Sequence, residues 1–366
     1  MIVGPRPAKS SEYDELMRLL ERSYRVPREH FQEDYPHIWR PDTINMKDRF
    51  IIKEKGRIVS HVGLIPFEII SDDKFIKVAG IGGVASDPDC RGKGYMGTLL
   101  KFAVKEMERR KYPISILWGD RFRYGNFGWE QSNLTLYTEF TARDIEKWKP
   151  AKSLKIKKYC GSKTDLQIIM KIHESEPLRV YRTKAVYKAL MGRPRQETWM
   201  ANAGKGWGYM TISEKEGKKI IGERGGEPRA VMGLVPQIIR RIGFEPIKIA
   251  QSNRITLLTE VLLRTCSFCY LEAQAMIKII DLDATLEAFG VDTAGIRFKM
   301  TADSEDRFEP LKPISGREVR LPQTAMARML FTDAVKNRYF RIDTDLAVKL
   351  GSLFPLEFYA WPIENI

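Results

Sequence analysis

Residues 82–97 have the sequence Gly-Gly-Val-Ala-Ser-Asp-Pro-Asp-Cys-Arg-Gly-Lys-Gly-Tyr-Met-Gly, and the apolar run 98–104 follows directly. This pattern predicts a strand that enters a glycine-rich turn and then a helix. The first amides of a helix have no partner within it, and the helix dipole adds positive potential at that end. Glycines let a ligand approach the backbone, while Arg91 and Lys93 add positive charge. We interpret the stretch as a diphosphate site; an ordinary tight turn with solvated charges is the alternative.

The composition predicts a folded protein without a membrane-spanning segment. The chain has 366 residues, of which 43% are hydrophobic, and is long enough for two or three domains. Its apolar runs are too short to span a bilayer, and its N-terminal residues lack the apolar core of a signal peptide. We therefore expect a cytoplasmic protein with no membrane partner.

The net charge of +14 raises the question of a nucleic-acid partner. The basic residues are spread along the chain among 47 acidic ones, and no DNA- or RNA-recognition motif is present. A basic surface also suits capture of a polyanionic cofactor, so the charge is compatible with either reading. We expect no nucleic-acid partner; steeply salt-dependent binding to duplex DNA would revive that option.

The cysteines are too few and too scattered for a disulfide framework. Cys266 and Cys269 form a single Cys-x-x-Cys pair in a protein with four histidines. Buried thiols are expected there rather than a zinc site, and no metal is expected.

Regular elements are predicted on both sides of the glycine-rich stretch. They are a helix over residues 7–24, strands over 49–54, 57–70 and 75–84, a helix that ends near 111, and a buried strand over 114–118. Residues 28–46 lack a clear period and are interpreted as a second helix or a lid-like loop.

In this setting the glycine-rich stretch resembles the Arg-x-x-Gly-x-Gly/Ala pyrophosphate loop of the GNAT N-acetyltransferases. The order helix, antiparallel strands, loop, helix, strand is also that of a GNAT core. Met96 stands where that pattern has a final glycine or alanine. Residues 124–129, Tyr-Gly-Asn-Phe-Gly-Trp, are similar to a segment of the Eis-like (enhanced intracellular survival) branch, which tolerates a bulky residue at the position of Met96.

The resemblance implies a mixed α+β fold and binding of acetyl-CoA. The cofactor-binding residues that it implies are Val84, Ala85, Ser86, Arg91, Gly92, Lys93, Gly94, Tyr95, Met96, Gly97 and Gly119. Tyr124 would act as the general acid that protonates the departing thiolate, since its ordinary pKa of about 10 is above that of the thiol. The alternative for Tyr124 is an aromatic side chain that closes a glycine turn.

Two further domains are predicted after the first, which spans residues 1–150. Residues 151–270 repeat the order of elements without the glycine-rich loop, which indicates a second GNAT-like domain that has lost cofactor binding. Residues 271–366 resemble the sterol-carrier-protein-like C-terminal domain of Eis-like proteins. In that family the terminal carboxylate acts as the base, a role that falls to Ile366. The alternative is a terminus that packs for stability only.

The sequence therefore predicts an acetyl-CoA-dependent N-acetyltransferase that acts by direct transfer in a ternary complex. The acceptor would be a primary amine of an aminoglycoside-like, polyamine-like or lysine-type small molecule, with Glu130, Glu364 and the terminal carboxylate able to counter its ammonium group. Two alternatives to this function remain. One is transfer of another acyl group, and the other is a catalytically silent acyl-CoA-binding or regulatory protein. The resemblance also implies a homo-oligomer, a hexamer in Eis-like proteins.

Overall fold

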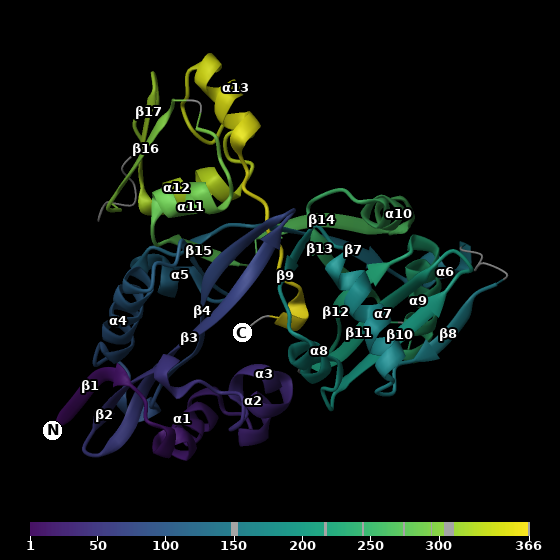
Figure 1. Ribbon diagram of the computed structural model, residues 1–366, viewed down its shortest axis with the longest axis horizontal. Helices are drawn as coiled ribbons and strands as arrows, with labels where there is room; N and C mark the ends of the chain where they lie inside the picture. The colour runs from purple at the N-terminus through teal and green to yellow at the C-terminus, as the bar shows by residue number, and fades with distance from the viewer. Residues whose placement is uncertain are drawn as a thin grey trace.

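The computed structural model describes residues 1–147, 153–215, 218–243, 245–273, 275–293, 295–303 and 311–364. The described chain has a mixed α+β fold with two large sheets and one small one, as predicted. Figure 1 shows each large sheet in a body of its own, and the small sheet in a third body that lies against the end of the first. The predicted linker at 148–152 lies outside the described residues.

The first sheet contains the strands on either side of the glycine-rich stretch. Its order is β1-β2-β3-β4-β5-β15-β6, and β9 pairs with the far end of β3. These strands are β1 (Ile2–Pro7), β2 (Arg49–Glu54), β3 (Arg57–Ser71), β4 (Lys74–Ser86), β5 (Ile114–Leu117), β6 (Glu130–Gln131), β9 (Leu178–Val180) and β15 (Met276–Ile279). Strands β2, β3 and β4 are antiparallel, and β4 and β5 are parallel because helix α4 (Tyr95–Arg109) connects them.

Helices cover both faces of this sheet because side chains alternate along its strands. Phe50 and Ile52 of β2 pack with α4, whereas Ile51 between them packs with helices of the opposite face. These helices are α1 (Tyr13–Tyr24), α2 (Arg28–Asp34) and α3 (Pro36–Trp39). The segment 28–46, interpreted as a helix or a lid, therefore begins with two short helices, and a strand at residues 2–7 was not predicted.

The second sheet repeats the order of the first. It runs β14-β7-β13-β12-β11-β10-β8, with β10, β11 and β12 antiparallel and β13 parallel to β12. Its strands are β7 (Leu134–Phe140), β8 (Lys155–Lys158), β10 (Gln196–Asn202), β11 (Trp207–Lys215), β12 (Lys218–Gly226), β13 (Ile247–Ser252) and β14 (Phe268–Ala273). Its helices are α6 (Ala142–Lys147), α7 (Lys163–Glu174), α8 (Lys184–Met191), α9 (Pro228–Arg241) and α10 (Leu257–Thr265).

The two large bodies exchange strands. Strand β7, which precedes the predicted boundary at 150, pairs with β13 and β14 of the second sheet. Strand β15, which follows the predicted boundary at 270, pairs with β5 and β6 of the first. The alternating pattern of a strand shows which face is buried but does not show which neighbour completes its hydrogen bonds.

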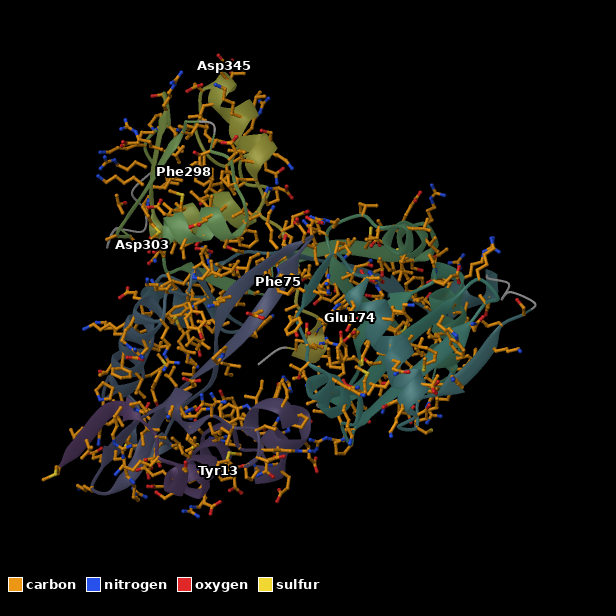
Figure 2. The ribbon with its side chains drawn as sticks, in the orientation of Figure 1. Tyr13, Phe75, Glu174, Phe298, Asp303 and Asp345 are labelled. Atoms are coloured by element: carbon orange, nitrogen blue, oxygen red, sulfur yellow. The ribbon has the colours of Figure 1, made fainter. Side chains whose placement is uncertain are left out.

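The third body is small and shares its core with the first sheet. It contains β16 (Arg297–Thr301), β17 (Glu318–Pro322), α11 (Leu282–Ala288), α12 (Gln323–Phe331) and α13 (Thr344–Leu353). Val78 of β4 belongs to the same apolar cluster as Met326 and Phe358. Figure 2 shows Asp345 at the outer end of this body, and Phe75 near the tip of the β3–β4 hairpin.

After α13 the chain returns to the junction between the two large sheets (Figure 1). A short helix, η5 (Pro362–Glu364), lies there: Arg193 Nη2 donates to the Ile363 carbonyl at 2.8 Å, and Ile363 faces Gly222 of β12. The terminal segment is anchored as predicted, as far as Glu364, the last residue that the structure describes. Ile366 lies outside the described residues.

The expectation of buried thiols at Cys266 and Cys269 was wrong. Cys269 is exposed because β14 is an edge strand whose side chains have little to cover them, and Cys266, at the end of α10, is partly exposed.

Candidate functional site

Strand β4 carries a bulge just before the glycine-rich loop. The β3–β4 register shifts between His61 and Gly63, so one more residue of β4 fits between the flanking pairs. Gly83 lies in this bulge at φ +60°, where a Cβ would be 2.5 Å from the Trp39 ring. A glycine is required there for both reasons.

The β4–β5 ladder is short. It runs from the Val78–Ile114 pair to the Gly80–Ile116 pair, whereas β4 continues to Ser86. In the part of the chain that the structure describes, β4 pairs beyond Gly80 with β3 only, which leaves backbone groups on the β5 side free for a ligand.

Hydroxyl groups hold the carbonyls of this part of β4. The carbonyls of Val84, Ala85 and Ser86 accept hydrogen bonds from Tyr24, Ser60 and Ser23, at 3.1, 3.0 and 3.2 Å. Tyr24 and Ser23 belong to α1, and Ser60 belongs to β3.

The glycine-rich loop leaves the N-terminus of α4 open. Gly94 is the N-cap at φ +76° without a side-chain cap, and Gly92 has φ +81°. A Cβ at either position would meet no heavy atom within 4 Å among the described residues. Arg91, Gly92, Lys93 and Gly94 are exposed, and Tyr95, Met96 and Gly97 are partly exposed. The geometry suits a phosphate at the helix end.

The equivalent helix of the second body is closed. Glu227 caps α9, its carboxylate accepting a hydrogen bond from the Ala230 amide at 2.7 Å. A negative charge therefore already stands where a phosphate would bind, in contrast to α4.

Lys93 has an ion-pair partner at the loop. Its Nζ lies 2.8 Å from Glu54 of β2, and this hydrogen bond lowers the pKa of the Glu54 carboxyl. Arg91 makes no ion pair with any described residue, so its charge is the freer of the two at the loop.

The segment after β5 brings Tyr124 toward the loop. Tyr124 ends the short helix α5 (Arg121–Tyr124) and is 7% exposed. A Cβ at the exposed Gly119 would lie 2.5 Å from the Tyr124 ring, and one at Gly97 would lie 3.2 Å from Phe127. Burial raises the pKa of Tyr124, so the phenol keeps its proton at neutral pH and can donate it.

A cavity of about 620 Å³ lies on the face of the first sheet opposite α4. Its walls come from β3, the segment around α3, β9 with the start of α8, and the terminal segment. Ile65 and Trp118 both line it. Ile65 pairs with Gly80, where the β4–β5 ladder ends, so the cavity reaches the place where β4 and β5 separate.

A buried charge cluster borders this cavity. Arg182 donates to Glu364 at 2.6 Å and to Glu223 at 2.8 Å, and Tyr209 donates to Glu223. Arg182 and Glu364 line the cavity. Burial is the main cause that raises the pKa of Glu364 to about 7. Glu130, which was also expected to face an ammonium group, is instead paired with Arg121 and Arg328.

Several cavity residues were not found from the sequence. Arg49, Arg182 and His37 stand in segments without a motif, and only the pairing of β2 with β3 and of β9 with β3 brings them together. No local signal marks them.

Among the described residues no cluster of three or more His, Cys, Asp or Glu side chains could hold a metal ion. Nor does any described helix have the length and apolarity needed to cross a membrane.

Residues 4–132 match the acetyltransferase (GNAT) domain family. This matched region contains the open helix end, the bulged strand and Tyr124, and it is similar to the GNAT acetyltransferase domain. Enzymes of this family use acyl-CoA donors.

Solved structures match nearly the whole chain. A GCN5-related N-acetyltransferase from Kribbella flavida is 14% identical over 98% of this chain and 97% of its own, with a TM-score of 0.71. A GCN5-related N-acetyltransferase from Anabaena variabilis is 16% identical over 97% and 98%, with a TM-score of 0.69. Eis1 from Mycobacterium abscessus is 9% identical over 100% of both chains, with a TM-score of 0.67. No curated protein sequence matches the chain.

Proposed function

We propose that the protein transfers an acetyl group from acetyl-CoA to a primary amine of a small molecule, by direct attack in a ternary complex. The observation that carries the proposal is that the open end of α4 and the unpaired edge of β4 stand on one side of the β4–β5 separation, and the cavity on the other. Donor and acceptor can thus meet without a covalent enzyme intermediate.

In this proposal the chain's own backbone holds the donor. Amides of residues 92–97 and the side chains of Arg91 and Lys93 bind the pyrophosphate, with Lys93 exchanging Glu54 for phosphate oxygens. The amides of Val84 and Ser86 bind the pantetheine and the thioester carbonyl, which stabilises the oxyanion of the tetrahedral intermediate. Gly119 keeps the Tyr124 ring close to this site.

The neutral amine nitrogen attacks the thioester carbon, and the carbon–sulfur bond breaks as the tetrahedral intermediate collapses. Tyr124 donates its proton to the departing thiolate. The Ile366 carboxylate takes the proton that the amine loses. Glu364 lines the cavity, and two further residues reach at most about 7 Å, which supports a terminus near the acceptor.

The likeness to Eis1 in fold and length supports an Eis-like arrangement. The second body, with α9 capped by Glu227, would wall the acceptor site, residues 271–366 would be the sterol-carrier-like part, and the assembly would be a homo-oligomer such as a hexamer.

The test is thiol release from acetyl-CoA by the purified full chain with spermidine, cadaverine, L-lysine and an aminoglycoside, followed by mass spectrometry of the products. Acetylated amine formed only with both substrates supports the proposal. Tight CoA binding without release with any of these amines would favour a catalytically silent acyl-CoA-binding protein. Faster thiol release from a longer acyl-CoA would show that the protein transfers that acyl group rather than acetyl.

A further inference from the structure

The charged side chains that line the cavity are arranged largely in pairs. Asp48 forms an ion pair with Arg110, and Glu364 forms one with Arg182. Glu68 of β3 stands directly opposite Lys77 of β4, where cross-strand neighbours of opposite charge attract each other. Each of these carboxylates therefore has a cation beside it.

Among the described residues that line the cavity, Arg49 is the cation that has no such carboxylate partner. Its side chain makes no ion pair with any described residue. Its Nη1 and Nη2 donate instead to the carbonyls of Leu64 and Ile38, at 2.9 and 3.1 Å, and the guanidinium lies 4.7 Å from the Trp39 ring centre. Carbonyls and an aromatic ring orient a guanidinium but do not cancel its charge.

Arg49 is also incompletely bonded. It is 3% exposed, and its buried Nε has no hydrogen-bond partner in the described part of the chain. Burial lowers its pKa to about 10 against the opposing effect of the nearby Asp48, which is itself paired with Arg110, and Arg49 stays charged at neutral pH. An unpaired buried charge is costly, and an anion with lone pairs in the cavity would relieve that cost.

His37 adds no compensating charge. Its Nδ1 is buried without a partner among the described residues, and burial together with Arg193 and Arg182 lowers its pKa to about 3, so it is a neutral imidazole. Among the described residues that line it, the cavity thus offers one guanidinium without an ion pair and one neutral hydrogen-bonding group.

We propose that the acceptor carries a carboxylate, which Arg49 binds, in addition to the amine that is acetylated. This inference rests on the proposed acetyl transfer and narrows its acceptor from amines in general to amino acids. It disfavours purely cationic polyamines and aminoglycosides.

The fold limits the length of such an acceptor. Arg49 pairs with Gly63, and Gly63 pairs with Gly82 in the part of β4 beyond the last β4–β5 pair. Neighbouring strands are about 4.8 Å apart, so about 10 Å separates the backbone of Arg49 from the edge where the thioester would lie. An acceptor of the size of lysine or ornithine spans this distance.

The decisive comparison is L-lysine with cadaverine, which differs from it only by the lost carboxylate, and with lysine methyl ester. We expect kcat/KM for lysine to exceed that for both by about tenfold or more, the usual value of a charged hydrogen bond. Calorimetric binding of lysine and cadaverine to the CoA-loaded protein should show the same order. Equal or weaker binding of lysine overturns the inference, whatever the turnover.

Variants separate this role from a structural one. Arg49→Met should reduce the lysine-to-cadaverine ratio to near one, chiefly through the KM for lysine, and Arg49→Lys should restore part of it. Arg193→Met is the matched control, because Arg193 is also an arginine with a buried, unpartnered Nε among the described residues and a bond to a backbone carbonyl, but it does not line the cavity. If Arg193→Met loses activity, its lysine-to-cadaverine ratio should still equal that of the wild type. An unchanged ratio in Arg49→Met overturns the inference. If no amine is acetylated, the proposed function fails, and the binding comparison still decides the role of Arg49.

Discussion

Arg182 and Glu364 lie 182 positions apart in the chain and are joined by a hydrogen bond of 2.6 Å in a buried site. Arg182 follows β9, and Glu364 belongs to η5 at the end of the described chain. The pair ties the terminal segment to the junction of the two large sheets and to the wall of the cavity.

Removing Arg182 should destabilise the protein strongly. Arg182→Met leaves Glu223 and Glu364 buried without their cation, which costs about 3 to 5 kcal/mol for a buried pair. Thermal unfolding measures this loss. The control is Arg109→Met, because Arg109 pairs with Glu106 on the exposed surface of α4 and should change stability far less than Arg182→Met does. Equal effects of the two changes would contradict a buried network.

Glu364 should make stability depend on pH. One guanidinium faces two buried carboxylates, and burial raises the pKa of Glu364 from its ordinary 4.5 to about 7. The folded state therefore holds a proton that the unfolded state releases. This contribution is fully present below pH 4.5 and is lost as pH rises through about 7.

The measurement is the Tm of wild type and of Glu364→Gln, which cannot titrate, between pH 5 and pH 8. Relative to the variant, the wild type should lose stability across this range. A constant difference in Tm would show that Glu364 has the same pKa in both states.

Glycine substitutions inside and outside the glycine-rich loop should distinguish an effect on cofactor binding from an effect on stability. Gly92 has φ +81°, so Gly92→Ala costs roughly 1 kcal/mol of backbone strain and places a methyl group beside the expected phosphate. Gly56, in the turn between β2 and β3, has the same φ and the same open surroundings. Both changes should lower Tm alike, but only Gly92→Ala should raise the KM for acetyl-CoA. Equal KM values would place the phosphates elsewhere.

Tyr124→Phe tests the proposed general acid. The change removes one oxygen and should lower kcat by roughly 100-fold or more, with little change in the KM for acetyl-CoA. Thiol-release assays measure both kcat and the KM for acetyl-CoA. Tyr159→Phe, in the second body, is the matched control and should leave kcat unchanged. If Tyr124→Phe keeps wild-type kcat, Tyr124 only packs against Gly119.

The local parts of this fold were predictable. The glycines at 92, 94 and 97, and the apolar run after them, predicted the strand, turn and helix of β4 and α4, because backbone freedom and side-chain periodicity are properties of neighbouring residues. The same holds for the β2–β3 hairpin and for the repeated order of elements in the second body. The family of the first domain followed from motifs of this kind.

The parts that required the tertiary structure are contacts between distant segments. The exchange of β7 and β15 between the sheets, the cavity, and the cluster of Arg182 with Glu364 depend on which strand edges meet, and hydrogen bonds between strands carry no sequence code of their own. Arg49 looked like any charged residue at the start of a strand. Only its burial against Leu64, Ile38 and Trp39, without an ion pair to any described residue, made it a candidate for binding an anion. The sequence alone thus determined the glycine-rich turn and the helix that follows it, while the packing of the three bodies decided the cavity and the residues that line it.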